Sequence, residues 1–210
     1  MDMNITKNTT GIESVILTTP DPQAAAAFNE AAFGLGARLQ VRAGDAPTSG
    51  FRGFTLSLVV PGPSTVDSFF ESALAAGATT VKPAKKSFWG YGGVLQAPDG
   101  TLWKIATSSK KDSGATRTVD DFVVLLGVED VKATKQFYIE RGLTVAKSFG
   151  SKYVEFAAPA ASVKLALYGR RAAAKDAGVA PEGTGSHRVV FGGGLGTFTD
   201  PDGFEWETLA

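Results

Sequence analysis

The sequence of 210 residues contains no cysteine and one histidine, His187. The absence of cysteine excludes disulfides, thiol catalysis and thiolate metal sites. With one imidazole, a single chain cannot build an iron site of two histidines and a carboxylate, or a relay that needs a second histidine. An extradiol dioxygenase site of that kind is therefore excluded within one chain.

The chain also lacks an excess of charge, because 21 Lys and Arg residues balance 21 Asp and Glu residues. Without a net positive field we expect neither nucleic acid nor an anionic membrane as a partner. The one concentrated basic stretch, Lys82 to Lys86 with Lys110 and Lys111 beyond it, is interpreted as a solvated rim.

Long hydrophobic runs are missing as well. No stretch approaches the ~18 apolar residues of a membrane span, and the polar N-terminus carries no signal-peptide run. We therefore expect a cytoplasmic protein. The hydrophobic fraction of 43% and the charged fraction of 20% are typical of a soluble globular chain of one large domain or two small ones.

One sequence pattern occurs twice. Residues 98–104 and 201–207 both begin with Pro-Asp-Gly and contain a Trp, Trp103 or Trp206. Upstream, a set of five residues recurs 109 positions later: Val15, Leu17, Asp21, Ala24 and Phe28 return as Val124, Leu126, Asp130, Ala133 and Phe137. Self-similarity at a fixed offset indicates repeated supersecondary units. We predict an N-terminal half over 11–107, a linker over 108–118 and a C-terminal half over 119–210.

Propensity and turn signals predict the elements of both halves. Strands are expected over 14–19, 38–41, 54–60, 94–96, 102–107, 122–128, 144–148, 153–157, 163–168, 187–191, 197–199 and 205–209. Helices are expected over 24–33, 64–76, 132–140 and 170–177, with Asp21, Ser64 and Asp130 as N-caps. Residues 178–186 are expected to form a mobile loop. The glycine run 192–194 takes the place of a helix.

The period of two along a strand divides the repeat into two faces. Residues that both copies keep, such as Val15 and Val124, share one face and are expected to pack against the helices. The opposite face differs between the copies: it carries Ser14, Ile16, Leu102 and Lys104 in one half, and Val123, Leu125, Glu205 and Glu207 in the other. We expect function on this divergent face.

The succession of a strand, an Asp-capped helix with a Phe, further strands and the turn Asp200-Pro201-Asp202-Gly203 before Glu207 resembles the vicinal oxygen chelate superfamily. That group includes glyoxalase I, bleomycin-resistance proteins, fosfomycin-resistance enzymes and extradiol dioxygenases. The resemblance implies an α+β fold of tandem βαβββ modules. Their curved mixed sheets would form a cup around a ligand or a metal.

The resemblance also implies where metal ligands would fall. The first-strand ligand, usually His, falls at Ser14 and Val123, and the closing-strand ligand, usually Glu, falls at Lys104 and Glu207. Val123 cannot bind a metal, and the Lys104 ammonium opposes a divalent cation. His187 and Glu207 remain as metal ligands or catalytic groups, too few for the usual site. For Glu207, a pair with Lys104 across the cup is the preferred interpretation.

The segment Phe88-Trp89-Gly90-Tyr91 offers aromatic surface for stacking against a planar molecule. The predicted ligand contacts are Ser14, Ile16, Trp89, Tyr91, Lys104, Val123, Glu205 and Glu207.

The leading hypothesis is a protein that binds a small apolar or aromatic molecule with no cofactor. One alternative is a glyoxalase-like lyase or isomerase whose divalent metal is held by Glu207 and His187. Another is a structural or regulatory module without a ligand. A monomer and a homodimer both remain open.

Overall fold

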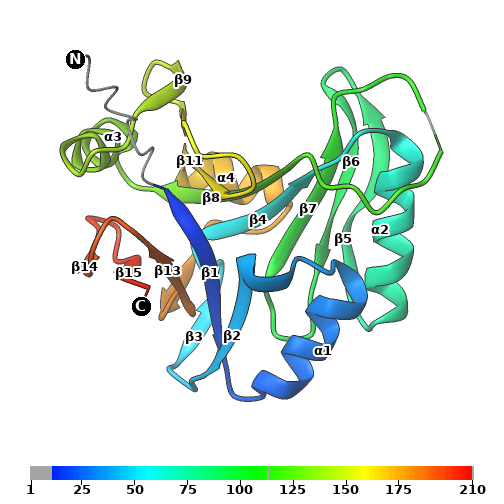
Figure 1. Cartoon of the computed structure of the whole chain (residues 1–210), viewed down its shortest axis with the longest axis horizontal. Coiled ribbons are helices and arrows are strands. Elements are labelled where there is room, and N and C mark those ends of the chain that lie inside the picture. Colours follow the sequence, from blue (N-terminus) through cyan, green and yellow to red (C-terminus); the bar gives the residue numbers. More distant parts are fainter. Residues whose placement is uncertain (1–10, 113, 210) are drawn as a thin grey trace, which may run out of the picture.

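The chain, described here from a computed structural model for residues 11–112 and 114–209, is built on one large mixed β-sheet (Figure 1). The helices are α1 (Pro22–Ala32), α2 (Pro63–Ala75), α3 (Val131–Glu140) and α4 (Arg170–Ala177), with a short 3-10 turn η1 (Gly36–Arg38). No helix in the described ranges has the length and apolar character needed to cross a bilayer.

The strands of the first half are β1 (Ile12–Thr19), β2 (Leu39–Ala43), β3 (Thr48–Gly50), β4 (Phe54–Val59), β5 (Thr79–Ser87), β6 (Gly90–Gln96) and β7 (Leu102–Thr107). Those of the second half are β8 (Asp121–Val128), β9 (Val145–Phe149), β10 (Tyr153–Phe156), β11 (Val163–Gly169), β12 (Gly183–Gly185), β13 (Val189–Gly193), β14 (Phe198–Thr199) and β15 (Glu205–Glu207).

Two complete βαβββ modules lie in the middle of the chain. In β4-α2-β5-β6-β7, the first strand pairs in parallel with the last, giving the order β4-β7-β6-β5. In β8-α3-β9-β10-β11 the same rule gives β8-β11-β10-β9. Reduced modules flank them: β1 with α1 and β2, and β13 with β15 and β14. The α+β class with tandem βαβββ modules is therefore confirmed.

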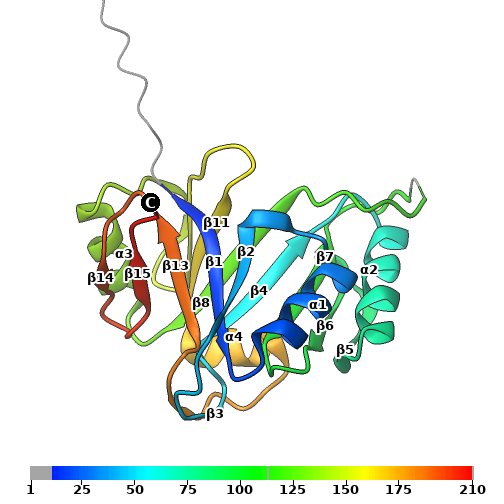
Figure 2. The same cartoon turned by 60° about the horizontal axis from the view of Figure 1, so that its bottom comes forward.

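The two halves form one sheet because strands of the first half pair with strands of the second half. β4 of the first half pairs antiparallel with β8 of the second, from Phe54↔Leu126 to Val59↔Asp121. β1 pairs antiparallel with β13, from Val15↔Phe191 to Leu17↔Val189. Figure 2 shows β1, β13, β8 and β4 running through the centre of the molecule, with α1 and α2 on one flank. Each face of the central sheet is consequently composed of residues from both halves.

The strand residues that the repeat keeps are buried on the helix side of the sheet. Trp103 and Trp206 are 0% and 2% exposed, and Val15 and Val124 are fully covered. Asp21 caps α1 by accepting from the Ala24 amide, as predicted. Asp130 likewise caps α3.

Several predicted elements need correction. The helix α2 begins at Pro63 after Gly62, and Ser64 does not cap it because its hydroxyl bonds the Asp112 carboxylate. No element was predicted over 79–87, where the structure has the strand β5, whose residues Lys85 and Lys86 are exposed. That strand ends the sheet, and lysines are common on edge strands because they discourage further pairing.

Two segments around His187 also differ from the prediction. The strand begins at Val189 and not at His187, because Arg188 has a positive φ of 54° that turns the chain. Within 178–186, Gly183–Gly185 forms β12, which pairs with β3. Gly50 lies so close to this strand that a Cβ atom there would stand 2.3 Å from the Glu182 carbonyl oxygen.

The segment between the halves has no helix or strand over 108–112 and 114–118. Ser113, inside the predicted linker, and Ala210, the last residue of the predicted C-terminal half, lie outside the described residues. The boundaries of the two halves stay a prediction.

A buried polar chain supports the second Trp. Trp206 Nε1 donates to the Tyr138 hydroxyl at 3.1 Å, and that hydroxyl donates to Asp200 Oδ2 at 2.7 Å. Asp200 also accepts the amides of Asp202 and Phe204. Burial raises the pKa of Tyr138 well above its ordinary value, and the Asp200 charge adds to the rise. Tyr138 thus stays a neutral donor to the carboxylate.

Replacing Tyr138 by Phe leaves Asp200 and Trp206 without a shared partner in a buried site. We expect the free energy of unfolding to fall by about 1–3 kcal/mol, since unpaired buried polar groups carry that cost. Urea denaturation measures the change. Tyr91→Phe, which removes an exposed hydroxyl bonded to Asp67, is the control and should change stability by less than about 0.5 kcal/mol. Equal losses in the two variants would contradict the role of the buried chain.

Candidate ligand-binding site

Four residues in register cross the sheet on the face opposite α1 and α2. Lys104 on β7 pairs with Ser57 on β4. Ser57 pairs with Val123 on β8, which pairs in turn with Lys164 on β11. Residues paired in this way project to the same side of a sheet. We call Lys104, Ser57, Val123 and Lys164 the lysine row.

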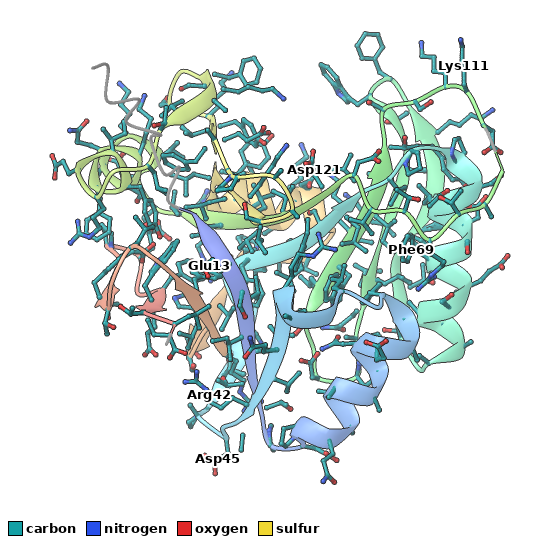
Figure 3. The ribbon with its side chains drawn as sticks, viewed as in Figure 1. Glu13, Arg42, Asp45, Phe69, Lys111 and Asp121 are labelled. Carbon is teal, nitrogen blue, oxygen red and sulfur yellow. The ribbon has the colours of Figure 1, made fainter. Side chains whose placement is uncertain are left out.

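Each lysine of the row has a carboxylate partner. Lys104 Nζ lies 2.7 and 2.9 Å from the two oxygens of Asp176 on α4. Lys164 Nζ lies 2.8 Å from Asp121, which Figure 3 labels at the start of β8. These four side chains are between 29% and 36% exposed, so both pairs are only partly screened by water. The charge of the row is therefore balanced by residues from outside it.

The helix α4 covers part of this face. Its residues Ala173, Ala174 and Ala177 pack with Phe51 and Leu102 in a small core of their own. A second lysine holds the end of the helix: Lys82 Nζ donates to the carbonyls of Lys175 at 2.9 Å and Asp176 at 2.8 Å. A cation at a helix C-terminus satisfies free carbonyls and suits the helix dipole. Lys82 and Lys104 together fix the last turn of α4 over the sheet.

A second row, formed by the other pair of exchanged modules, consists of Ser14, Gly192 and Glu207, which are in register on β1, β13 and β15. Ser14 is 1% exposed, and its hydroxyl has no hydrogen-bond partner among the described residues. Leu209 covers Gly192, where a Cβ atom would stand 2.6 Å from Leu209 Cδ2. Ile16 and Glu205 flank this row through Val190. The structure thus brings together the four predicted residues Ser14, Ile16, Glu205 and Glu207.

The predicted pair of Lys104 with Glu207 is wrong. Lys104 bonds Asp176, whereas Glu207 lies 2.5 Å from Arg42 Nη2. The reason is the exchange of strands between the halves, which places the closing strands β7 and β15 on opposite sides of the central strands. Val123 accordingly lies with Lys104, and Ser14 lies with Glu207.

His187 lies far from Glu207. Its Nδ1 atom is 2.5 Å from the Arg52 carbonyl oxygen, and its Nε2 atom is 3.0 Å from the Asp202 carbonyl oxygen. The ring stacks on Phe204, with centroids 3.9 Å apart. Glu207 pairs with Gly192, three residues into β13 from Val189 and thus roughly 10 Å further along the strand. Both ring nitrogens lie against backbone carbonyl oxygens, one of Arg52 and one of the Asp202 turn, and the structure does not bring the two predicted ligands together.

Arg52 occupies the position in the first half that His187 has in the second. Each stands two residues before the first strand of a module, β4 or β13. The Arg52 guanidinium donates to the carbonyl of Asp99, just as His187 approaches that of Asp202. Each side chain therefore holds one copy of the repeated Pro-Asp-Gly turn. This correspondence gives His187 a structural role in the turn.

Trp89 and Tyr91 are not on the lysine-row face. Trp89 is 83% exposed at the β5–β6 turn, where it contacts Phe88 edge to face at 5.0 Å. Tyr91 is in register with Thr107, which shares its side of β7 with Trp103, and its hydroxyl donates to Asp67 on α2. That hydrogen bond raises the pKa of Tyr91. The aromatic segment therefore divides between the helix side and solvent.

A cavity of about 290 Å³ lies beside the lysine row, where β4 and β7 begin. Leu102 and Gln96 are in register with each other, and Leu102 lies two residues from Lys104 on the same face. The lining includes Phe51, Phe54, Leu102 and Val179 as apolar side chains and Arg52, Gln96 and Glu182 as polar ones. Burial lowers the pKa of Arg52, while the Asp99 charge acts in the opposite direction. An apolar space next to a partly desolvated guanidinium suits a small molecule with an anionic group.

Sequence reasoning missed Arg52, Asp176 and Lys164. Arg52 could have been found from its place two residues before a strand, since His187 has the same place. Asp176 and Lys164 sit on elements that were predicted correctly, but their roles depend on the packing of α4 and on the β8–β11 register. No local signal predicted those contacts.

The donor groups of the two rows suit a divalent cation poorly. One row offers two ammonium groups and a hydroxyl, and the other offers the Ser14 hydroxyl and one carboxylate that already pairs with Arg42. Throughout residues 11–112 and 114–209, no three His, Asp or Glu side chains gather in a metal-binding group.

No protein-family model and no curated protein sequence matches the chain. Among solved structures, glyoxalase I from Zea mays superposes with a TM-score of 0.63 at 13% identity, covering 95% of this chain and 92% of that one. A putative dioxygenase from Bacillus subtilis gives 0.54 at 12% identity, covering 88% of this chain and 70% of that one. The chain has the glyoxalase fold.

These matches confirm the fold that the resemblance, drawn from the repeat and the Asp-Pro-Asp-Gly turn, implied. In this chain the row that contains Val123 has a lysine at each end, Lys104 and Lys164. At these levels of identity the fold is shown, and the roles of individual residues come from the geometry described above.

Replacing Lys104 by Met removes the ammonium that binds Asp176 on α4. We expect backbone amides in α4 to exchange with deuterium about fivefold faster, because a partly exposed ion pair contributes about 1 kcal/mol to local stability. Lys164→Met is the matched control, since its pair with Asp121 has similar exposure and does not touch α4. Equal acceleration in both variants would argue against the lysine clamp on α4.

Proposed function

We propose that this protein binds a small molecule with an apolar or aromatic body and an anionic group in the cavity beside Arg52, without a metal ion. Sequestration of such a molecule is the activity that the site would support. The observation that carries the proposal is a partly buried guanidinium that lines a cavity together with the apolar side chains of Phe51, Phe54 and Leu102.

The cavity provides the apolar contacts that such a ligand needs. Phe51, Phe54 and Leu102 are 3%, 2% and 6% exposed, so their positions are fixed by the core around them. Fixed aromatic and aliphatic walls bind flat apolar groups with little loss of side-chain entropy. A volume of about 290 Å³ is at the lower end of the range for small-molecule sites. The ligand is therefore expected to be a compact one.

Arg52 provides the polar recognition. Within the described part of the chain, its guanidinium makes one hydrogen bond, to the Asp99 carbonyl. A guanidinium has five N–H donors in a planar fork that matches a carboxylate. An anionic group would also offset the desolvation that lowers the pKa of Arg52. Glu182 lines the same cavity and should weaken the binding of any anion.

Binding of 1-naphthoate, compared with neutral 1-naphthalenemethanol, tests this proposal by calorimetry. Arg52→Met is expected to weaken naphthoate binding at least about tenfold and to leave naphthalenemethanol binding nearly unchanged, because a charge-assisted hydrogen bond contributes about 1.5–3 kcal/mol. Glu182→Gln should strengthen naphthoate binding. The melting temperature of each variant without ligand serves as the folding control.

Two results would overturn the proposal. The first is failure of both compounds to bind the unaltered protein. The second is an equal loss for both compounds in Arg52→Met, since this would assign the effect to a disturbed cavity and not to charge.

The metal-dependent alternative has its own test. Elemental analysis of the purified protein and of Glu207→Gln measures the metal content directly. A stoichiometric metal that disappears in Glu207→Gln would favour a glyoxalase-like lyase or isomerase over the metal-free site. We expect no difference between the two proteins, because Glu207 is paired with Arg42 and lies apart from His187.

A further inference from the structure

Two large aromatic side chains protrude from one end of the molecule. Phe88 and Trp89 are 86% and 83% exposed at the turn between β5 and β6. Exposed lysines surround them, Lys85 and Lys86 on β5 and Lys110 and Lys111 after β7. The turn lies against the start of that segment, because a Cβ atom at Gly90 would meet the Thr107 carbonyl. We call Phe88, Trp89 and these four lysines the aromatic tip.

An apolar hollow of about 530 Å³ lies elsewhere in the same half. Its wall is formed by Ala24, Ala27, Phe28 and Ala31 of α1, by Ala76, and by Pro98 at the β6–β7 turn. Two carboxylates, Asp21 and Asp99, line it too, and no cationic side chain does so within the described ranges. We call this hollow the alanine groove.

We propose that the aromatic tip of one molecule binds in the alanine groove of a second copy of this chain. The two surfaces are complementary in chemistry. The tip presents aromatic rings among four ammonium groups, and the groove presents small apolar side chains beside two carboxylates. Charges of opposite sign at the edge of a contact direct association and select the partner. The groove can therefore cover the exposed rings of the tip, and its carboxylates can lie beside the ammonium groups of the tip.

The positions of the two surfaces point to a closed pair. The tip is at one end of β6 and the groove at the other, next to Pro98. Figure 1 shows the β5–β6 turn at the top and α1 with the β6–β7 turn at the bottom, and Figure 3 labels Lys111 at the upper end. Two copies placed side by side in opposite directions would bring the tip end of each beside the groove end of the other. A two-fold arrangement of this kind ends at a dimer.

The areas involved also favour two contacts over one. A buried Phe or Trp covers roughly 150–250 Å², so one tip and its groove bury roughly 600–1,000 Å² together. A single contact of that size is marginal for a stable complex, whereas two reach the roughly 1,200–2,000 Å² of a standard interface. The dimer should depend on both contacts.

Sedimentation equilibrium of the purified chain over a range of concentrations tests this inference. We expect a monomer–dimer equilibrium whose dissociation constant rises at least about tenfold in Trp89→Ser and in Ala27→Lys. The controls are Phe149→Ser, an aromatic 66% exposed on another hairpin, and Ala26→Lys, an exposed alanine of α1 outside the groove. Both controls should dimerise as the unaltered chain does.

Mixing the two impaired variants gives the sharpest result. Trp89→Ser retains an intact groove and Ala27→Lys retains an intact tip, so a mixed pair regains one contact of two. We expect the mixture to associate more tightly than either variant alone.

Tryptophan fluorescence gives a second measurement of the same contact. Because Trp103 and Trp206 are buried in the core, a change in emission on dissociation comes from Trp89. Dilution of the dimer should shift that emission to longer wavelength.

Three outcomes would overturn the inference. They are a monomer at every concentration, a dimer that persists unchanged in Trp89→Ser and Ala27→Lys, and a mixture that associates no better than its components. None of them bears on ligand binding at Arg52, which calorimetry measures on the monomer or dimer alike.

Discussion

Two antiparallel strand pairings, β4 with β8 and β1 with β13, determine the rest of the structure. Each joins the first strand of a module in one half to the first strand of a module in the other. Because of this exchange, every row across the central sheet combines residues from both halves. The lysine row takes Lys104 and Ser57 from one half and Val123 and Lys164 from the other. A substitution in either half therefore changes a site that both halves build.

The copies of the repeat keep their geometry and differ in how polar groups are satisfied. Trp206 donates to Tyr138 in a chain that ends at Asp200. The residue at the position of Tyr138 in the first half is Asn29, and there Trp103 Nε1 and Asn29 Nδ2 have no partner among the described residues. Both Trp rings stack on a Phe: Trp103 on Phe33 with centroids 4.1 Å apart, and Trp206 on Phe198 at 5.4 Å. The copies therefore share the ring packing and differ in the hydrogen bonds of the Trp, since shape is the property that both copies need.

Much of the fold could be predicted from the sequence, because the repeat, the Asp caps and strand periodicity are local signals. The helix over 170–177 and the strand over 102–107 were predicted with their observed bounds. The strand β5 was missed because its lysines hide the alternation of an edge strand. Periodicity predicted that Ser14, Lys104, Val123 and Glu207 share the divergent face, but it predicted neither the register of Ser14 with Glu207 nor the partner of Lys104. Asp176 meets Lys104 only because α4 packs on the sheet, and the local sequence does not predict that packing.

The lysine row and α4 depend on each other. Two ammonium groups on one face of a sheet repel each other and oppose a cation, so the face is stable when anionic groups come from elsewhere. Asp121 meets Lys164 within the sheet, and Asp176 meets Lys104 from α4. Once α4 is drawn onto the sheet, the segment after it closes one wall of the cavity at Arg52. Lys104 thus has two effects on this face: its ammonium opposes a divalent cation, and its pair with Asp176 anchors the helix that precedes one wall of the cavity. Lys104 is therefore a residue that positions the proposed binding cavity through the helix α4.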